Sequence, residues 1–112
     1  MKIVTEVLLL TELKQMAVIF GNMVKAVVDV EKEIIAMDAE LHSDLEALLL
    51  DNGSKQKNLW GINLYPEIHG DDFVEFDSMI NMRPSQGNRS RGVENEEIRR
   101  KITDIVSKRI KR

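Results

Sequence analysis

The chain of 112 residues has no cysteine, only two prolines, and few aromatic residues: one Trp, one Tyr and three Phe. Without cysteine there is no disulfide bond, no thiolate nucleophile and no cysteine-ligated metal, and we expect a reducing, cytoplasmic setting. So few aromatic side chains provide little surface on which the bases of a nucleic acid could stack. The apolar run Val7–Leu10 is too short to span a membrane and lies between Glu6 and Glu12, so we expect neither a signal peptide nor a membrane helix.

The motifs of most catalytic chemistries are missing as well. The phosphate-loop spacing Gly-x-x-x-x-Gly-Lys does not occur. His42 and Asp44 flank Ser43, but Ser43 fits the role of a helix cap better than that of a nucleophile. The only other histidine, His69, is far away in the sequence, which argues against a zinc site. We therefore expect a binding or interaction module without a cofactor rather than an enzyme.

Charge is distributed unevenly along the chain. Residues 1–82 carry 6 Lys and Arg against 15 Asp and Glu, whereas residues 83–112 carry 10 against 4, although the net charge is only −3. A basic C-terminal part on an acidic body is typical of contact with phosphate groups or nucleic acid, or of a basic helix that packs against the body. The hydrophobic fraction of 43% and the charged fraction of 31% are those of a globular domain.

Hydrophobic periodicity predicts alternating strands and helices. A period near two predicts a strand, and a period near 3.6 predicts a helix. The predicted strands cover residues 2–7, 24–30, 33–37, 59–65 and 73–82, and the predicted helices cover 12–20, a short segment from Ser43 to Asn52-Gly53, and 94–110. Because short turns join the strands, we expect an α+β fold: a single domain, residues 1–112, with a mainly antiparallel sheet of four to five strands and about three helices packed on one face.

Polar residues and glycines predict the helix ends. Thr11 is placed to cap the first helix, and Gly21 follows its end. Ser43 and Glu46 have the spacing of a capping box, in which each side chain binds the backbone N–H of the other residue. The second helix would then stop at Gly53.

The first predicted helix is apolar on more than one face. Val18 and Ile19 widen its hydrophobic stripe, which indicates deep burial or a partner surface. A homodimer formed through this helix or through an exposed sheet edge is therefore one alternative.

The leading candidate for a binding site is the loop that follows the last predicted strand. Arg83, Arg89 and Arg91 lie within nine positions, next to the flexible Gly87. Guanidinium forks and free backbone N–H groups are the donors that bind phosphate or carboxylate. The predicted anion-binding residues are Arg83, Gln86, Asn88, Arg89 and Arg91, with Asn63 and Asn81 on the polar sheet face beside them. The ligand would be a phosphate-bearing or acidic molecule, and nucleic acid is a weaker alternative.

Two alternative roles for these charged residues stay open. The arginines of the loop would be structural if they pair with Asp71, Asp72 or Asp77. In a function of another class, strand carboxylates such as Asp29 and Asp77, with Glu75 nearby, would hold a divalent cation in a small metal-dependent hydrolase or nuclease. No loop with the spacing of metal ligands supports that alternative.

Five segments carry a resemblance to a known family. They are Val24–Val30, Leu41–Glu46, Gly53–Gln56, Leu59–Pro66 and Asp77–Arg89, the last of which reads DSMINMRPSQGNR. In these segments the chain resembles a family of small bacterial and archaeal proteins catalogued as a domain of unknown function. The resemblance implies a compact cytoplasmic domain, and it implies no activity, cofactor or partner.

Overall fold

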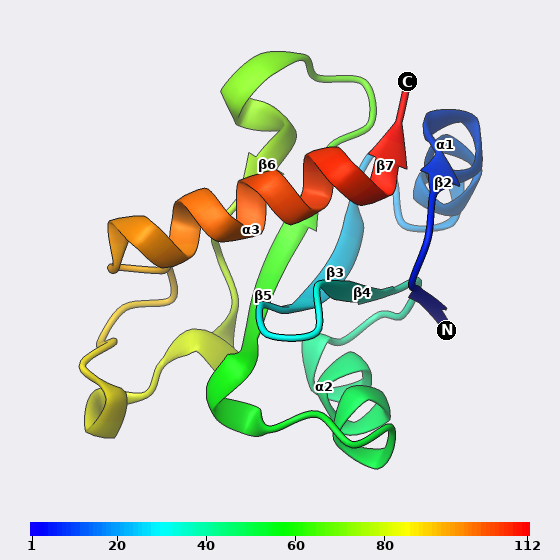
Figure 1. Ribbon diagram of the computed structural model, residues 1–112. Helices are drawn as coiled ribbons and strands as arrows, with labels where there is room; N and C mark the ends of the chain where they lie inside the picture. Colours follow the sequence, from blue (N-terminus) through cyan, green and yellow to red (C-terminus); the bar gives the residue numbers. More distant parts are fainter.

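The computed structural model describes all residues from Met1 to Arg112 and has a five-stranded antiparallel sheet at its centre (Figure 1). The strand order is β1-β4-β3-β5-β6, so β1 and β6 are the two edges. The strands of this sheet are β1 (Lys2–Val4), β3 (Val24–Asp29), β4 (Ile34–Met37), β5 (Leu59–Leu64) and β6 (Val74–Glu75). A separate parallel pair joins the two ends of the chain, β2 (Leu8–Leu9) and β7 (Ile110–Lys111). The predicted α+β fold with an antiparallel sheet is confirmed.

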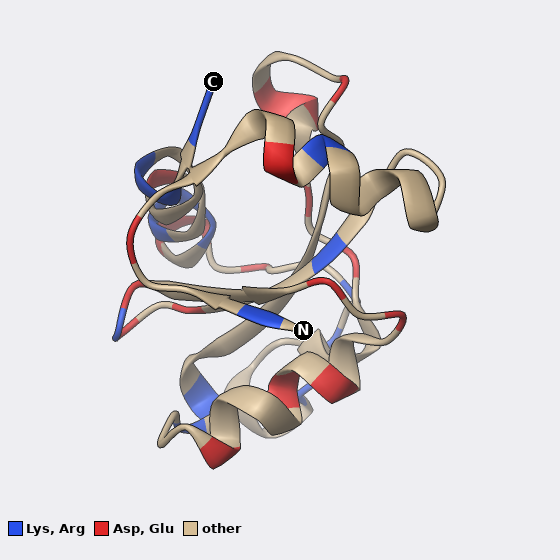
Figure 2. Ribbon diagram, turned by 90° about the vertical axis from the view of Figure 1, so that its right-hand side faces the viewer, with Lys and Arg blue, Asp and Glu red and all other residues tan.

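Three helices cover the sheet, but on both of its faces. They are α1 (Leu10–Ile19), α2 (His42–Asp51) and α3 (Glu96–Arg109). Figure 2 shows α1 and α3 on one side of the sheet and α2 on the other, so the placement of all helices on one face is wrong. The physical reason lies in strand β4, where all four residues are buried, a pattern typical of a strand covered on both sides.

Alternate residues of the central strands supply two hydrophobic cores. Val28 packs into the larger core with Ile102 of α3, whereas its neighbour Val27 packs into the smaller core with Leu45 and Leu49 of α2. This division follows from the period of two along a strand, which sends successive side chains to opposite faces. The sheet is therefore the middle layer of a three-layer domain.

The predicted strand over residues 73–82 is wrong beyond Glu75. It pairs with β5 as the expected hairpin only at Glu75 and Val74, and short 3-10 turns follow at Met79–Asn81 and Pro84–Gln86. The hydroxyl of Ser78 accepts the Ile80 N–H at 3.3 Å, which starts the first of these turns. This local hydrogen bond stabilises the turn that follows the strand.

Two of the predicted helix caps are also wrong. Helix α1 begins before Thr11, and the Glu12 carboxylate accepts the N–H of Leu9 at 3.1 Å. Helix α2 begins at His42, so Ser43 lies inside the first turn and caps nothing. The predicted C-terminal ends are confirmed, because Gly21 and Gly53 follow α1 and α2 with φ of 86° and 94°.

Helix α3 begins two residues later than predicted. The Asn95 side chain accepts the Ile98 N–H at 3.0 Å and caps the helix. None of the three helices has the length and apolar character that crossing a membrane requires.

Candidate functional site

Arg83, the first arginine of the predicted anion loop, is buried with only 8% of its surface exposed. Its guanidinium donates to three backbone carbonyls: Nε to Ile80 at 3.0 Å, Nη1 to Gln56 at 2.8 Å, and Nη2 to Leu59. It also lies 4.4 Å from the centre of the Trp60 ring. Burial lowers the pKa of Arg83 from its usual value. Arg83 therefore fastens the loop to β5 and is not open to solvent.

Two asparagines of the predicted site are buried as well. Asn81 accepts the Gly61 N–H at 2.8 Å and donates to the Gly61 carbonyl at 2.9 Å. Asn88 donates to the Asn81 carbonyl at 2.7 Å and accepts the Glu94 N–H at 2.8 Å. The side-chain amides of both residues hydrogen-bond to backbone groups, so they stabilise the conformation of the loop.

Asn63 lies in a polar cluster at the start of α2. Its Nδ2 donates to Glu75 at 2.8 Å and to the Asp77 carbonyl at 3.2 Å, whereas its buried Oδ1 has no hydrogen-bond partner. His42 lies next to it and its Nε2 is 2.8 Å from the Ile62 carbonyl. Burial lowers the pKa of His42, while the Ile62 carbonyl, Asp77 and Asn63 favour the protonated form. His42 is therefore a buried, hydrogen-bonded core residue.

The remaining residues of the predicted loop site are exposed. Arg91 pairs with Asp77, with Nε 2.7 Å from Oδ1. Gln86 is exposed, and the Arg89 guanidinium has no hydrogen-bond or ion-pair partner. The structural alternative thus holds for Arg91, which pairs with Asp77, and Arg83 is buried against backbone carbonyls. Anion binding by Arg89 stays a prediction.

The backbone donors of this loop already hold a carboxylate of the chain itself. The N–H groups of Arg89 and Ser90 donate to the same Glu94 oxygen at 2.6 and 2.8 Å. These two bonds, led by the one from Ser90, lower the pKa of Glu94. These two backbone N–H groups are therefore occupied by Glu94 and are not free to bind another anion.

The carboxylates proposed for a metal-dependent enzyme do not come together. Asp29 is 1% exposed, and its oxygens accept the N–H groups of Glu31 and Lys32 at 2.9 Å each and the Ser54 hydroxyl at 2.6 Å. It closes the turn between β3 and β4. Asp77 belongs to the separate network with Arg91. No group of three or more His, Asp or Glu side chains is arranged to hold a metal ion.

A cavity of about 630 Å³ lies between α3 and the segment that leads into β6. We call it the α3 groove. Its apolar lining residues come from both sides and are Phe73, Val74, Phe76, Val106 and Ile110. Phe73 and Val106 belong to the larger core, so the groove has a rigid apolar floor. A volume in this range suits a small organic molecule or a short stretch of polymer.

Four cationic side chains line the α3 groove, and none of them pairs with a carboxylate. They are Arg99, Arg100, Lys111 and Arg112. The ion pairs of the protein lie elsewhere, at Lys14–Glu67, Arg91–Asp77 and Lys108–Glu33. Asp71 and Glu96 also line the groove, each without an ion pair. Positive charge is therefore in excess there and is not neutralised by contact.

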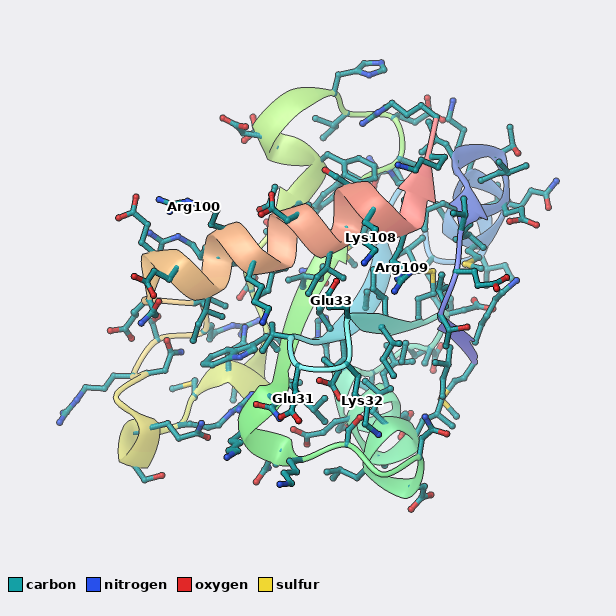
Figure 3. All side chains as sticks on the ribbon, in the orientation of Figure 1. Glu31, Lys32, Glu33, Arg100, Lys108 and Arg109 are labelled. Carbon is teal, nitrogen blue, oxygen red and sulfur yellow. The ribbon has the colours of Figure 1, made fainter.

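Each cation of the groove is held differently. Arg99 donates to the carbonyls of Val93 and Glu94, just before α3, and Lys111 donates to the Ser107 carbonyl at 3.2 Å. Arg112 lies 4.9 Å from the centre of the Phe73 ring. Arg100 makes no contact of this kind and extends freely from α3 in Figure 3. Arg100 is thus the most available donor, and the other three are partly positioned in advance.

The opposite side of α3 is bound to the acidic body. Lys108 pairs with the Glu33 carboxylate at 2.9 Å, and Arg109 donates to the Glu33 carbonyl at 2.8 Å. Figure 3 shows both side chains directed toward the turn between β3 and β4, whereas Arg100 extends from the other side of the helix. The excess of positive charge in residues 83–112 is therefore divided between a packing surface and the groove.

The predicted site did not include the residues of the α3 groove. The sequence did carry one signal for them, the excess of Lys and Arg after residue 83. What it lacked was the position of the segment 70–76, which a tertiary contact brings alongside α3.

A family described as "Protein of unknown function (DUF5674)" matches residues 2–109. No curated protein and no solved structure matches the chain. The match extends over nearly the whole domain, including both central hairpins and α3, so the chain belongs to this family of proteins of unknown function.

Proposed function

We propose that this protein is a binding module that holds an anionic ligand with an apolar part in the α3 groove. The observation that carries the proposal is the set of four cations without carboxylate partners around an apolar floor. Arginine forks bind phosphate and carboxylate strongly, and an apolar cavity adds affinity for the rest of the ligand. This keeps the predicted class of ligand and moves the site from the 83–91 loop to α3.

A phosphate-bearing aromatic compound is the simplest probe of this site. Phenyl phosphate combines one dianionic group with one ring, and we expect it to shift the backbone amide NMR signals of Thr103 and Ser107, which line the groove. Phenol, which lacks the charge, and inorganic phosphate, which lacks the ring, should bind more weakly. Absence of any shift with phenyl phosphate up to the limit of its solubility contradicts the proposal.

Two arginines provide a matched pair of variants. Arg100 and Arg89 are both exposed and both lack an ion-pair partner, but only Arg100 lines the groove. Arg100→Ala should weaken phenyl phosphate binding about tenfold, the loss expected for one charge-assisted hydrogen bond. Arg89→Ala should leave it unchanged. The reverse result would return the site to the 83–91 loop.

The setting and the oligomeric state are further parts of the proposal. We place the protein in the cytoplasm, which is consistent with its lack of cysteine.

A homodimer through α1 stays a prediction, and the high exposure of Val18 (79%) and Ile19 (75%) favours it. Light scattering over a dilution series tests it, and a monomer at every concentration would remove it.

A further inference from the structure

We infer that the occupant of the α3 groove is an extended peptide segment with acidic residues at both ends and apolar residues in the middle. This inference rests on the proposed function and specifies its ligand. It follows from three features: the spacing of the cations, the chemistry between them, and the free backbone groups of β6.

The cations of the groove form two pairs. Arg99 and Arg100 lie in the first half of α3, and Lys111 and Arg112 lie beyond its end. At about 1.5 Å per helical residue, Arg100 lies about 14 Å from the end of α3 at Arg109, and Lys111 follows two residues later in the extended β7. An extended peptide advances about 3.3 Å per residue, so about four to six residues span the two pairs.

The lining between the two pairs carries no cation. Along α3 and its end it includes Thr103, Val106, Ser107 and Ile110, and on the other side of the groove it includes Phe73, Val74 and Phe76. The Thr103 hydroxyl already donates to the Arg99 carbonyl at 3.0 Å, so this stretch is largely apolar. A matching ligand keeps its charges at the ends and places apolar groups in the middle.

Strand β6 offers backbone groups to such a peptide. It is an edge strand, and the bond from the Tyr65 N–H to the Phe73 carbonyl makes these two residues a hydrogen-bonded pair of the antiparallel ladder. Glu75 and Asn63 form the next such pair. The N–H and C=O of Val74, the residue between, therefore point away from β5 toward the open edge. Because Val74 lines the groove, a peptide backbone there can pair with it.

A nucleic-acid strand fits these features less well. It would place a phosphate at every nucleotide, including those beside the uncharged middle of the groove. Stacking of bases requires free aromatic faces, but Phe73 is only 7% exposed and has Arg112 over its ring. The charge pattern thus favours a polypeptide.

The experiment uses fluorescence polarisation to measure the affinity of the full chain for three designed peptides. The test peptide has two acidic residues at each end of a short apolar core. One control has the same composition with all acidic residues at one end, and another has the test sequence with N-methylated amides in the core. We expect each control to bind about tenfold more weakly, the loss of one cation pair or of backbone pairing.

Variants of the protein locate the two contacts. Arg100→Ala and Lys111→Ala should each weaken binding of the test peptide about tenfold. Only one of the two variants should weaken binding of the one-ended control peptide, because its acidic end can occupy only one pair of cations. Lys101→Ala is the matched control, because Lys101 is an exposed cation of α3 that does not line the groove. It should leave the affinity unchanged.

The outcomes separate the inference from the proposed function. Equal binding of all three peptides, together with binding of phenyl phosphate, would overturn the inference and leave the proposed function standing. Tighter binding of oligothymidylate than of the test peptide would also overturn it and assign the groove to nucleic acid. Binding of neither phenyl phosphate nor any peptide would overturn both.

Discussion

The side-chain amide of Asn81 pairs with the backbone of Gly61 as a neighbouring strand would. Gly61 donates its N–H to Asn81 Oδ1 at 2.8 Å, and Asn81 Nδ2 donates back to the Gly61 carbonyl at 2.9 Å. Strand β6 ends at Glu75, so it cannot reach this part of β5. Asn81, together with Arg83 on the Leu59 carbonyl, completes the edge of the sheet where a strand is missing. Residues that the sequence marked as ligand-binding thus serve the fold.

Replacing Asn81 by alanine should destabilise the protein strongly. Both backbone groups of Gly61 would stay buried without a partner, and each such group costs about 1–3 kcal/mol. We expect Asn81→Ala to lower the free energy of unfolding by about 2–6 kcal/mol in urea titrations. Gln86→Ala, an exposed change in the same loop, is the control and should stay within about 0.5 kcal/mol of the parent. Equal stabilities of the two variants would show that Asn81 does not hold the edge of β5.

Gly61 itself should not accept a side chain. A Cβ atom at this position would lie 2.5 Å from both Cβ and Oγ of Ser78, closer than packed atoms approach. We expect Gly61→Ala to cost about 1–3 kcal/mol through overpacking. At Gly92 a Cβ would have its nearest contact at 3.4 Å, so Gly92→Ala is the matched control with a small effect. Thermal unfolding of the two variants measures the difference, and similar midpoints would contradict the close packing.

His42 should make stability depend on pH. Burial lowers its pKa below the usual value near 6.5, so the unfolded chain takes up a proton at a higher pH than the folded one. The contribution of His42 to the free energy of unfolding is therefore complete above about pH 6.5. It decreases as the pH falls toward the pKa of His42 in the folded protein. His42→Gln keeps a donor for the Ile62 carbonyl and should flatten this decrease. His69→Gln, a change in the exposed connection, should keep the same decrease of stability at low pH. If the decrease disappears in His69→Gln instead, His69 and not His42 causes it.

Glu94 should control the order of the 83–91 loop. Its carboxylate accepts the N–H groups of Arg89 and Ser90, so Glu94→Ala removes the acceptor of both. We expect amide hydrogen exchange at these two residues to become faster while the helical amides of α3 keep their protection. Glu97→Ala, an exposed change in the first turn of α3, is the control. Unchanged exchange at Ser90 would show that the loop is ordered without Glu94.

The central strands could be predicted because their signals are local. In β3 and β5, the predicted and observed ends differ by one residue, since β-branched residues and Pro66 mark them directly. The ends of α1 and α2 were predictable for a similar reason, because Gly21 and Gly53 take a positive φ that favours glycine. Such features depend on the residue and its immediate neighbours.

The end of β6 could not be predicted, because the cause lies on another strand. Val74 and Phe76 continue a pattern of alternation that is typical of a strand. The chain nevertheless leaves the sheet, and Ser78 packs where Gly61 has no side chain. Only the pairing of β5 with its neighbours brings Ser78 and Gly61 together.

By itself, the sequence determined the class of fold, the paired central strands and the place where positive charge accumulates, because these follow from local periodicity and composition. The tertiary structure decided which cations stay unpaired. Lys108 meets Glu33, which is 75 positions away in the chain, whereas Arg100 on the other side of α3 meets no acid. Pairing of charges depends on distances that folding sets between remote segments, so the candidate groove became visible only in three dimensions.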